Sequence, residues 1–117
     1  MTAFNAANTS IIDGATFAEL QDAAGAEFAA ELVGTFLEEA PQMLAELHSA
    51  MAESSADRFR RAAHSLKSNS QTFGAWALGA LARDLELSGL PSDAKVLHAV
   101  EAEYQRAAAA LKELIRG

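Results

Sequence analysis

His64 and Lys67 are the two residues of this 117-residue chain whose types and spacing could do chemistry together. They are three positions apart in a segment with helical periodicity, so their side chains project from the same side of a helix. A neutral imidazole offers one ring nitrogen with a free lone pair, and the sequence places no carboxylate next to His64. The ammonium of Lys67 could neutralise a phosphoryl group delivered to that nitrogen. The pair therefore predicts a nucleophilic histidine beside a cation.

A helix built around His64 has an inward side and a polar side. The inward residues lie within about 60° of Phe59 on a helical wheel. They are Ala62, Ala63, Leu66, Ser70 and Phe73. The polar side carries Arg60, Arg61, His64, Lys67, Ser68 and Gln71. His64 is therefore expected to face solvent in mid-helix among cations, and the small Ser68 leaves a partner room to approach.

The charge of the chain is unevenly distributed. The sequence has 9 basic and 16 acidic residues, a net charge of −7, yet residues 1–53 contain nine acids and no lysine or arginine. One segment has five cations and no acid, namely Arg58, Arg60, Arg61, Lys67 and Arg83. A net acidic protein is poorly suited to many phosphate contacts with nucleic acid, whereas one basic segment suits an acidic protein surface. We predict a basic platform around His64; the alternative interpretation is a solvated helix face.

Two other sets of residues could carry chemistry by their types, but we interpret neither as a metal site or a catalytic pair. His48 and His98 lie on other predicted helices without a second ligand three or four residues away, so they are read as surface or partly buried histidines and not as metal ligands. Glu38 and Glu39 are adjacent and do not share a helix face, which is typical of solvated carboxylates. No glycine-rich phosphate loop or Walker-type lysine occurs, so we expect no ATP binding and no self-phosphorylation. We also expect no metal and no cofactor in this chain.

The elements that position the histidine are predicted to be helices, because the sequence is rich in alanine and has only two prolines and seven glycines. Residues 1–12 are interpreted as a loose arm, and Asp13 is predicted to cap a short helix that ends near Gly25. A long helix follows, with a kink expected at Pro41. Its inward stripe is predicted to contain Phe28, Leu32, Phe36, Ala40, Leu44, Leu47 and Met51.

The second half of the chain contains the remaining predicted helices. Ser54 or Ser55 is expected to cap the helix that carries the histidine, and Gly74 to interrupt that helix. A further helix begins near Trp76, a residue expected in the core, and Ser92 is predicted to cap the last helix after a turn. The inward stripe of the last helix is predicted to be Leu97, Val100, Tyr104, Ala108, Leu111 and Ile115.

Amphipathic helices with short connections pack most economically as an antiparallel bundle. We predict an all-α fold, an up-down four-helix bundle over residues 13–117 with a short extra N-terminal helix. The absence of cysteine excludes disulfides and thiolate metal sites, and the N-terminus lacks the basic start and apolar stretch of a secretory signal. No apolar run approaches the roughly 20 residues of a membrane span. We expect a cytoplasmic protein, and the Met1 start and the arm favour a free-standing one.

The segment from His64 to Ala75, His-Ser-Leu-Lys-Ser-Asn-Ser-Gln-Thr-Phe-Gly-Ala, resembles the signature of the histidine-containing phosphotransfer (HPt) domain. The usual form of that signature is His-x-Leu-Lys-Gly-Ser-Ser followed by Gly-Ala. Residues 36–41, 60–63 and 78–86 also resemble the segments that flank the histidine in this family, and the resemblance covers roughly residues 13–115. Ser68 and Asn69 depart from the pattern, because they replace the usual glycine and serine.

The resemblance implies a phosphorelay intermediate and not a kinase. His64 would accept a phosphoryl group from a receiver-domain aspartate, or through a histidine kinase pathway, and pass it to another receiver aspartate. Lys67 would neutralise the phosphoryl charge, and Arg60, Arg61 and Arg83 would contribute to the electrostatics of partner binding. Any Mg²⁺ would belong to the partner receiver domain. The implied partners are response-regulator receiver domains and a hybrid or sensor histidine kinase, with no nucleic acid and no membrane, and we expect a monomer.

Supporting roles fall to four residues. Ser68 and Gln71 would hydrogen-bond the imidazole or the phosphoryl group, and Glu86 would orient the ring through its other nitrogen. Gly74 would let adjacent helices approach closely, because it has no side chain. The alternative function is a non-catalytic helical interaction module that binds a receiver or kinase without phosphate transfer. A third interpretation, in which the chain also dephosphorylates its partner, has no dedicated base beyond His64.

Overall fold

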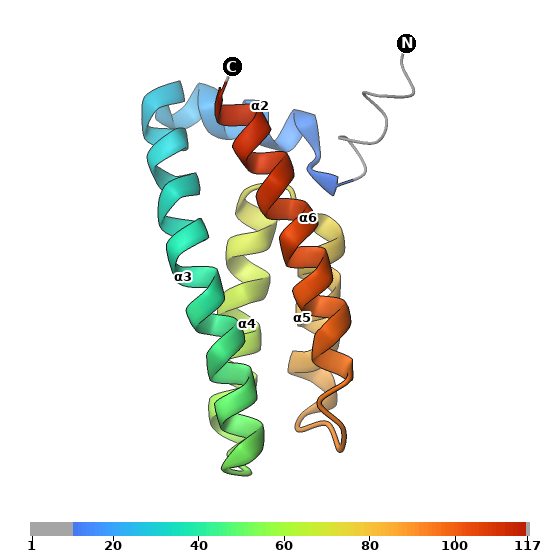
Figure 1. The fold of residues 1–117 in the computed structure, drawn as a ribbon. Coiled ribbons are helices and arrows are strands. Elements are labelled where there is room, and N and C mark those ends of the chain that lie inside the picture. Colours follow the sequence, from blue (N-terminus) through green and yellow to red (C-terminus); the bar gives the residue numbers. More distant parts are fainter. Residues whose placement is uncertain (1–10, 117) are drawn as a thin grey trace.

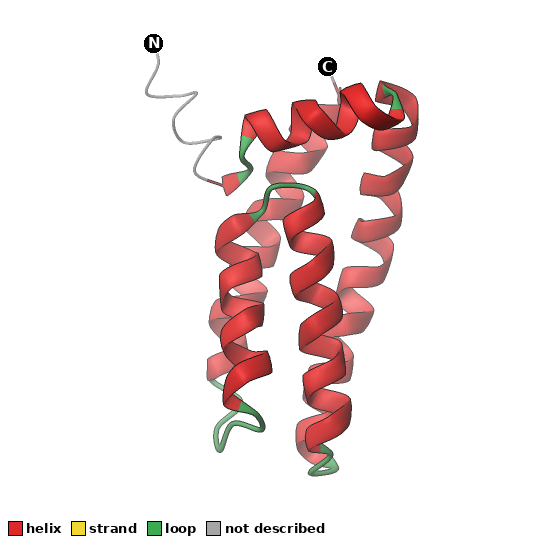
Figure 2. Cartoon of the chain, turned by 180° about the vertical axis from the view of Figure 1, so that it is seen from behind, coloured by secondary structure: helices red, strands yellow, loops and turns green. Residues whose placement is uncertain are grey.

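The computed structural model describes residues 11–116, so most of the predicted arm, residues 1–10, lies outside the described residues. The helices are α2 (Gly14–Ala24), α3 (Ala26–Ala52), α4 (Ala56–Thr72), α5 (Trp76–Ser88) and α6 (Val96–Arg116). Figure 1 shows α3 to α6 running along the long axis of the molecule, with α2 lying across one end. Short turns join each long helix to the next, which runs in the opposite direction (Figure 2). The predicted all-α antiparallel bundle with an extra N-terminal helix is confirmed.

The inward face of α3 differs slightly from the predicted stripe. Its buried residues are Ala29, Val33, Phe36, Ala40, Leu44, Leu47 and Ala50. Phe28, which was predicted to be inside, is 52% exposed, while Leu32 and Met51 are only partly buried. Successive steps of four residues drift around a helix, so Phe28 is rotated by about 80° from the buried Phe36. The helix continues through Pro41 as one element, and the kink at this residue stays a prediction.

The inward face and the cap of α4 agree with the sequence analysis. The buried residues of this helix are Phe59, Ala62, Ala63, Leu66 and Ser70. The Ser55 hydroxyl accepts a hydrogen bond from the backbone N–H of Arg58 at 3.4 Å, and Asp57 lies in the first turn. After Phe73, Gly74 turns the chain into α5 with a φ of +78°, a left-handed conformation that favours glycine. Gly74 therefore ends α4 where the sequence predicted an interruption.

The turn between α4 and α5 is held against the start of α2. The backbone N–H of Asp13 donates to the Gly74 carbonyl at 2.9 Å, and the Asp13 Oδ2 atom accepts a hydrogen bond from Trp76 Nε1 at 3.0 Å. Asp13 also caps α2 as predicted, because its Oδ1 atom accepts from the backbone N–H of Ala15. Trp76 is 49% exposed, so its predicted place in the core is wrong. Its indole N–H needs a polar partner, and Asp13 supplies that partner at the surface.

The last helix, α6, begins at Val96 and not directly after Ser92. The Asp93 side chain accepts a hydrogen bond from the backbone N–H of Lys95 at 2.9 Å. The next amides bond to carbonyls three residues back, so the chain forms tight turns before the α-helix starts. The predicted cap at Ser92 is therefore wrong. The inward stripe is confirmed over its buried residues Leu97, Val100, Tyr104, Ala108 and Leu111, and Ile115 is partly buried.

Candidate functional site

His64 lies in the middle of α4 and pairs with Glu86 of α5. The His64 side chain is 56% exposed, and its Nδ1 atom lies 2.7 Å from Glu86 Oε2. The expectation that no carboxylate adjoins His64 is therefore wrong, because a residue 22 positions further along the chain supplies one. Glu86 lies at a ring nitrogen, where the resemblance implied an orienting group.

The Glu86 contact determines which ring nitrogen of His64 can react. An ionised carboxylate only accepts hydrogen bonds, so in the neutral ring the hydrogen resides on Nδ1. Nε2 then holds the free lone pair, and no hydrogen bond to it occurs within residues 11–116. Nε2 is also the ring nitrogen farther from the backbone. A partner can therefore reach the nucleophilic atom from solvent.

Lys67 contacts the second oxygen of the same carboxylate. Its Nζ atom lies 2.8 Å from Glu86 Oε1, so the two groups form an ion pair. The Lys67 and Glu86 side chains are only 22% and 16% exposed, so solvent screens this pair less than a fully exposed one. The Lys67 ammonium first, and the His64 ring second, hold the pKa of Glu86 below its ordinary value. Glu86 is therefore a carboxylate at neutral pH.

Helices α4 and α5 come close together near this cluster at Gly79. A Cβ atom at Gly79 would lie 3.4 Å from Gln71 Cγ, 3.7 Å from Ser70 Cβ and 3.8 Å from the Lys67 carbonyl oxygen. These are ordinary van der Waals distances, so the space between the two helices at Gly79 is just wide enough for a Cβ atom. Gly79 was not among the predicted site residues, although a glycine inside a helical stripe is a signal of close packing. The spacing of the two helices sets the gap that the Glu86 side chain bridges.

Three other predicted site residues form no hydrogen bond to the histidine within residues 11–116. Ser68 and Gln71 are exposed on α4, and within the described residues neither forms a hydrogen bond to His64. Gly74 acts at a different place from the predicted one. A Cβ atom there would lie 3.0 Å from the Asp13 carbonyl oxygen, which is at the start of α2 and not between two bundle helices.

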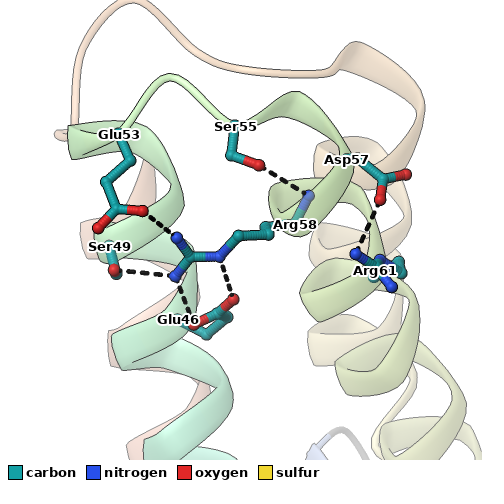
Figure 3. Close-up of polar contacts among 7 residues, drawn as sticks. All are labelled: Glu46, Ser49, Glu53, Ser55, Asp57, Arg58 and Arg61. Carbon is teal, nitrogen blue, oxygen red and sulfur yellow. Dashed lines mark hydrogen bonds and ion pairs between the residues drawn. The ribbon is translucent and has the colours of Figure 1, made fainter.

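The predicted basic platform is largely neutralised in the folded chain, and Arg58 shows this most clearly. Its Nε and Nη2 atoms lie 2.7 and 2.9 Å from the two oxygens of Glu46, and it also contacts Glu53 and Ser49 (Figure 3). This forked contact ties the start of α4 to the end of α3. Hydrogen bonding to Arg58 holds the pKa of Glu46 below its ordinary value. Arg58 is therefore a structural clamp between two helices.

The other platform cations are also paired, with one exception. Arg60 and Arg61 lie 2.6 and 2.8 Å from the two oxygens of Asp57, and Lys67 is paired as described above. These acids lie outside the cation-only segment of the sequence. Asp57 reaches its cations from the preceding turn of α4, whereas Glu46 and Glu86 reach theirs because α3 and α5 pack against α4. Paired acids therefore offset most of the positive charge of the predicted basic platform. Within residues 11–116, Arg83 is the one cation of the five without an ion pair, and it is exposed.

The remaining candidates lie apart from this cluster. His48 Nε2 lies 2.9 Å from Glu101 Oε2, which joins α3 to α6, and His98 is exposed. Glu38 and Glu39 are both exposed. In the described part of the chain, no group of three or more histidine, cysteine, aspartate or glutamate side chains could hold a metal ion.

Comparison with known proteins relates this geometry to a family. The family model described as Hpt domain matches residues 31–110, the segment that contains α4 and α5. The fold is similar to the crystal structure of histidine-containing phosphotransfer protein B (HptB) from Pseudomonas aeruginosa PAO1, with a TM-score of 0.84 and 25% sequence identity over 91% of this chain and 95% of that chain. A comparison with curated proteins gives no match. Across residues 11–116, no helix is both long and apolar enough to cross a membrane.

The chain belongs to the Hpt domain family, because the family model matches most of its length. It is a histidine phosphotransfer intermediate of a phosphorelay, as the resemblance implied. Hpt proteins are phosphocarriers and not kinases, and they interact with receiver domains and histidine kinases.

Proposed function

We propose that His64 accepts the phosphoryl group at Nε2, and that Glu86 and Lys67 assist the transfer. The observation that carries the proposal is the double contact of Glu86, which binds Nδ1 of the ring with one oxygen and the Lys67 ammonium with the other. This arrangement leaves the outer nitrogen of an exposed histidine as the nucleophile, beside a cation. Among the described residues, no other histidine has Nδ1 bound to a carboxylate that also pairs with a lysine.

The transfer starts from a receiver whose aspartate carries the phosphoryl group as an acyl phosphate. The Nε2 lone pair attacks phosphorus in line, an N–P bond forms while the P–O bond to the aspartate breaks, and the aspartate leaves as a carboxylate. The ring keeps its hydrogen on Nδ1 and becomes cationic as the N–P bond forms. Glu86 stabilises this new charge because its oxygen lies 2.7 Å from Nδ1. The reverse attack by another receiver aspartate removes the phosphoryl group.

Lys67 acts on the phosphoryl side of the reaction. Its ammonium is paired with Glu86 at rest and lies within one helical turn of His64, so it can turn towards the phosphoryl oxygens and neutralise part of their charge. The exposed Ser68 and Gln71 are available as hydrogen-bond donors to the same oxygens. In this proposal Mg²⁺ is held by the acidic pocket of the receiver, and the chain needs no cofactor of its own.

The proposal also covers the partners of the reaction, the oligomeric state of the chain and the compartment. The donor and acceptor are receiver domains of response regulators and of a hybrid or sensor histidine kinase, and the chain works as a monomer. The cysteine-free sequence supports a reducing compartment such as the cytoplasm. Phosphate arrives only from a partner, because the sequence carries no ATP-binding motif.

The test follows radiolabelled phosphate from phosphorylated receiver domains of the source organism onto the chain. Wild type is expected to gain acid-labile label, His64→Gln to gain none, and the matched variant His98→Gln, at another exposed histidine, to behave as wild type. If wild type gains no label from any receiver, or His64→Gln gains as much as wild type, the proposal is wrong. Receiver binding that survives without any transfer would instead select the non-catalytic interaction module.

A further inference from the structure

Gly79 lies on the buried side of α5, where this helix packs on α4. A Cβ atom at this position would lie 3.4 Å from Gln71 Cγ and 3.8 Å from the Lys67 carbonyl oxygen, both on α4. A single Cβ atom therefore fits between the helices, whereas the further atoms of a leucine side chain would press against α4. The close approach of α5 to α4 at this level depends on the absence of a long side chain at residue 79.

Gly79 and Glu86 share one side of α5. They are seven residues apart in the sequence, which is about two helical turns, so their directions differ by only about 20°. Both meet Lys67 of α4, because the Lys67 carbonyl oxygen lies opposite Gly79 and the Lys67 ammonium lies 2.8 Å from Glu86 Oε1. The spacing at Gly79 therefore acts on the same stretch of α4 that carries His64.

The start of α5 is anchored, whereas its other end leads into an irregular segment. Trp76, the first residue of α5, donates its indole N–H to Asp13 Oδ2 at 3.0 Å, and the backbone N–H of Asp13 donates to the turn that precedes the helix. Figure 2 shows this turn at the end of the bundle that α2 crosses. At its other end α5 leads into residues 89–95, which form no helix. A long side chain at residue 79 is therefore expected to tilt the end of α5 that carries Glu86 away from α4.

The position of Glu86 on α5 enlarges a small displacement. Gly79 is three residues from Trp76 and Glu86 is ten, so at about 1.5 Å per residue a tilt about Trp76 moves Glu86 about three times as far as Gly79. The Glu86 oxygens lie 2.7 Å from His64 Nδ1 and 2.8 Å from Lys67 Nζ. A hydrogen bond is lost beyond about 3.5 Å, so a shift of about 1 Å at Glu86 is enough to break its contact with the ring.

We propose that Gly79 is a positioning residue of the phosphorylation site, an inference that rests on the proposed function of His64. By keeping α5 close to α4, Gly79 lets Glu86 bind Nδ1 of the ring, which leaves Nε2 as the nucleophile. Gly79 has no side chain that could touch the ring or the phosphoryl group, so it acts through Glu86. A long side chain at residue 79 therefore slows phosphorylation of His64 even though His64, Lys67 and Glu86 are all retained.

The test compares Gly79→Ala with Gly79→Leu in the full chain. Two rates are measured, namely phosphoryl transfer from a phosphorylated receiver and labelling of His64 by phosphoramidate, a small phosphodonor. Gly79→Leu is expected to slow both by about threefold to tenfold, because the change acts at the ring and not on the receiver. Gly79→Ala is expected to keep both wild-type rates, because its Cβ atom fits. Gly79→Val, with the same expected direction as Gly79→Leu, decides the test if Gly79→Leu is unfolded by circular dichroism.

Two further measurements show whether Gly79 acts through Glu86. In a Glu86→Ala background, Gly79→Leu is expected to cause no further loss of rate, because the contact that it would break is already absent. Carboxyl NMR titration of Glu86 is the second measurement. The Lys67 ammonium first, and the His64 ring second, lower the Glu86 pKa, so Gly79→Leu is expected to raise this pKa towards its ordinary value and Gly79→Ala to leave it low.

Two other leucine substitutions control for the added bulk. Gly34→Leu makes the same exchange in α3, where, within residues 11–116, no atom of another helix lies within 4 Å of a Cβ atom. Ala80→Leu adds a long side chain at the next residue of α5, on the exposed side of the helix. Phosphoramidate is expected to label both variants at the wild-type rate. Circular dichroism and thermal unfolding check that each variant is folded.

The outcomes distinguish the positioning role from the proposed function. If folded Gly79→Leu is labelled at the wild-type rate, or if it loses rate by the same factor in the Glu86→Ala background, the positioning role is wrong and the phosphoacceptor stands. A slower rate with an unchanged Glu86 pKa, or an equal loss in Gly79→Ala, would also overturn the inference. If phosphoramidate fails to label His64 in wild type while Gly79→Leu still raises the Glu86 pKa, the effect of Gly79 on helix spacing stands and the phosphoacceptor is wrong.

Discussion

Two histidine–glutamate pairs join neighbouring helices of this bundle, and they differ in what surrounds them. His64 of α4 pairs with Glu86 of α5 at 2.7 Å, and His48 of α3 pairs with Glu101 of α6 at 2.9 Å. Both rings are substantially exposed, 56% for His64 and 42% for His48. An exposed histidine beside a carboxylate is therefore not enough to define a phosphorylation site.

The difference lies in the ring nitrogen that is bound and in the nearest cation. Glu86 binds Nδ1 of His64 and leaves Nε2 free, whereas Glu101 binds Nε2 of His48 and leaves the nitrogen next to the backbone. Lys67 adjoins the first pair, while the groove around His48 is lined by no lysine or arginine. A phosphoryl group at His48 would meet an uncompensated carboxylate. Reactivity at these histidines therefore depends on which ring nitrogen the carboxylate binds and on a balancing cation.

Replacing each histidine with glutamine should give the largest difference in phosphate uptake between the two pairs. His64→Gln is expected to reduce phosphate uptake from a phosphorylated receiver to background, because no nucleophilic nitrogen remains at the site. His48→Gln is expected to retain the wild-type rate. Uptake of acid-labile phosphate is the measurement. A substantial loss in His48→Gln, with the fold intact by circular dichroism, would show that the α3–α6 pair takes part.

Replacing Lys67, the cation beside the His64–Glu86 pair, should give the next largest effect on the rate of phosphoryl transfer. Lys67→Met is expected to slow transfer to His64 by about tenfold to a hundredfold, because the phosphoryl charge then faces Glu86 without compensation. Lys112→Met removes an exposed lysine on α6 and serves as the control, with no expected change. Rapid-quench measurement of the transfer rate checks this. Equal rates of phosphoryl transfer in Lys67→Met and wild type would show that the cation beside His64 does not account for the difference between the two histidine pairs.

Replacing each paired glutamate with glutamine should give a smaller difference in transfer rate between the two pairs. Glu86→Gln keeps a hydrogen-bond acceptor for Nδ1 but loses the charge that stabilises the cationic phosphorylated ring, so we expect about a three- to tenfold slower transfer. Glu101→Gln is expected to change nothing in the transfer assay. The two variants are compared under the same receiver and salt conditions. The same rate in both variants would contradict the role given to Glu86.

The smallest predicted effect concerns the protonation of Glu86. Its pKa is depressed chiefly by Lys67 and secondarily by His64, so Lys67→Met is expected to raise that pKa towards the ordinary glutamate value, more than His64→Gln does. A depressed carboxyl pKa adds stability above the unfolded pKa and loses it as pH falls through the folded pKa. The stability difference between wild type and Lys67→Met should therefore be present at neutral pH and shrink under acid conditions. Carboxyl NMR titration and denaturant unfolding measure both changes.

Much of the fold could be predicted from the sequence, because helix caps and the helical period depend on residues that are close together in the chain. Asp13 and Ser55 cap helices where the sequence indicated, and the inward residues of α4 and α6 follow the helical period. The predictions that were wrong concern residues at the ends of helices and on the surface of the bundle. Phe28 and Trp76 are large apolar residue types that are often buried, but both lie in the first turn of a helix, and what covers that turn is a property of the assembled bundle.

The spacing of residues along the chain is enough to show which of them share a side of α4, and therefore that His64 and Lys67 project together from an exposed face of this helix. That relation is fixed by the repeat of a single helix and needs no partner. The contacts of Glu86 depend on tertiary packing, because this residue is 22 positions from His64 and 19 from Lys67 in the sequence and reaches both. The same holds for the acids that lie outside the cation-only segment and pair with most of its cations. These contacts depend on how closely α4 packs against α5 and α3 and on how each helix is rotated about its axis. The balance of packing over the whole bundle sets that distance and rotation.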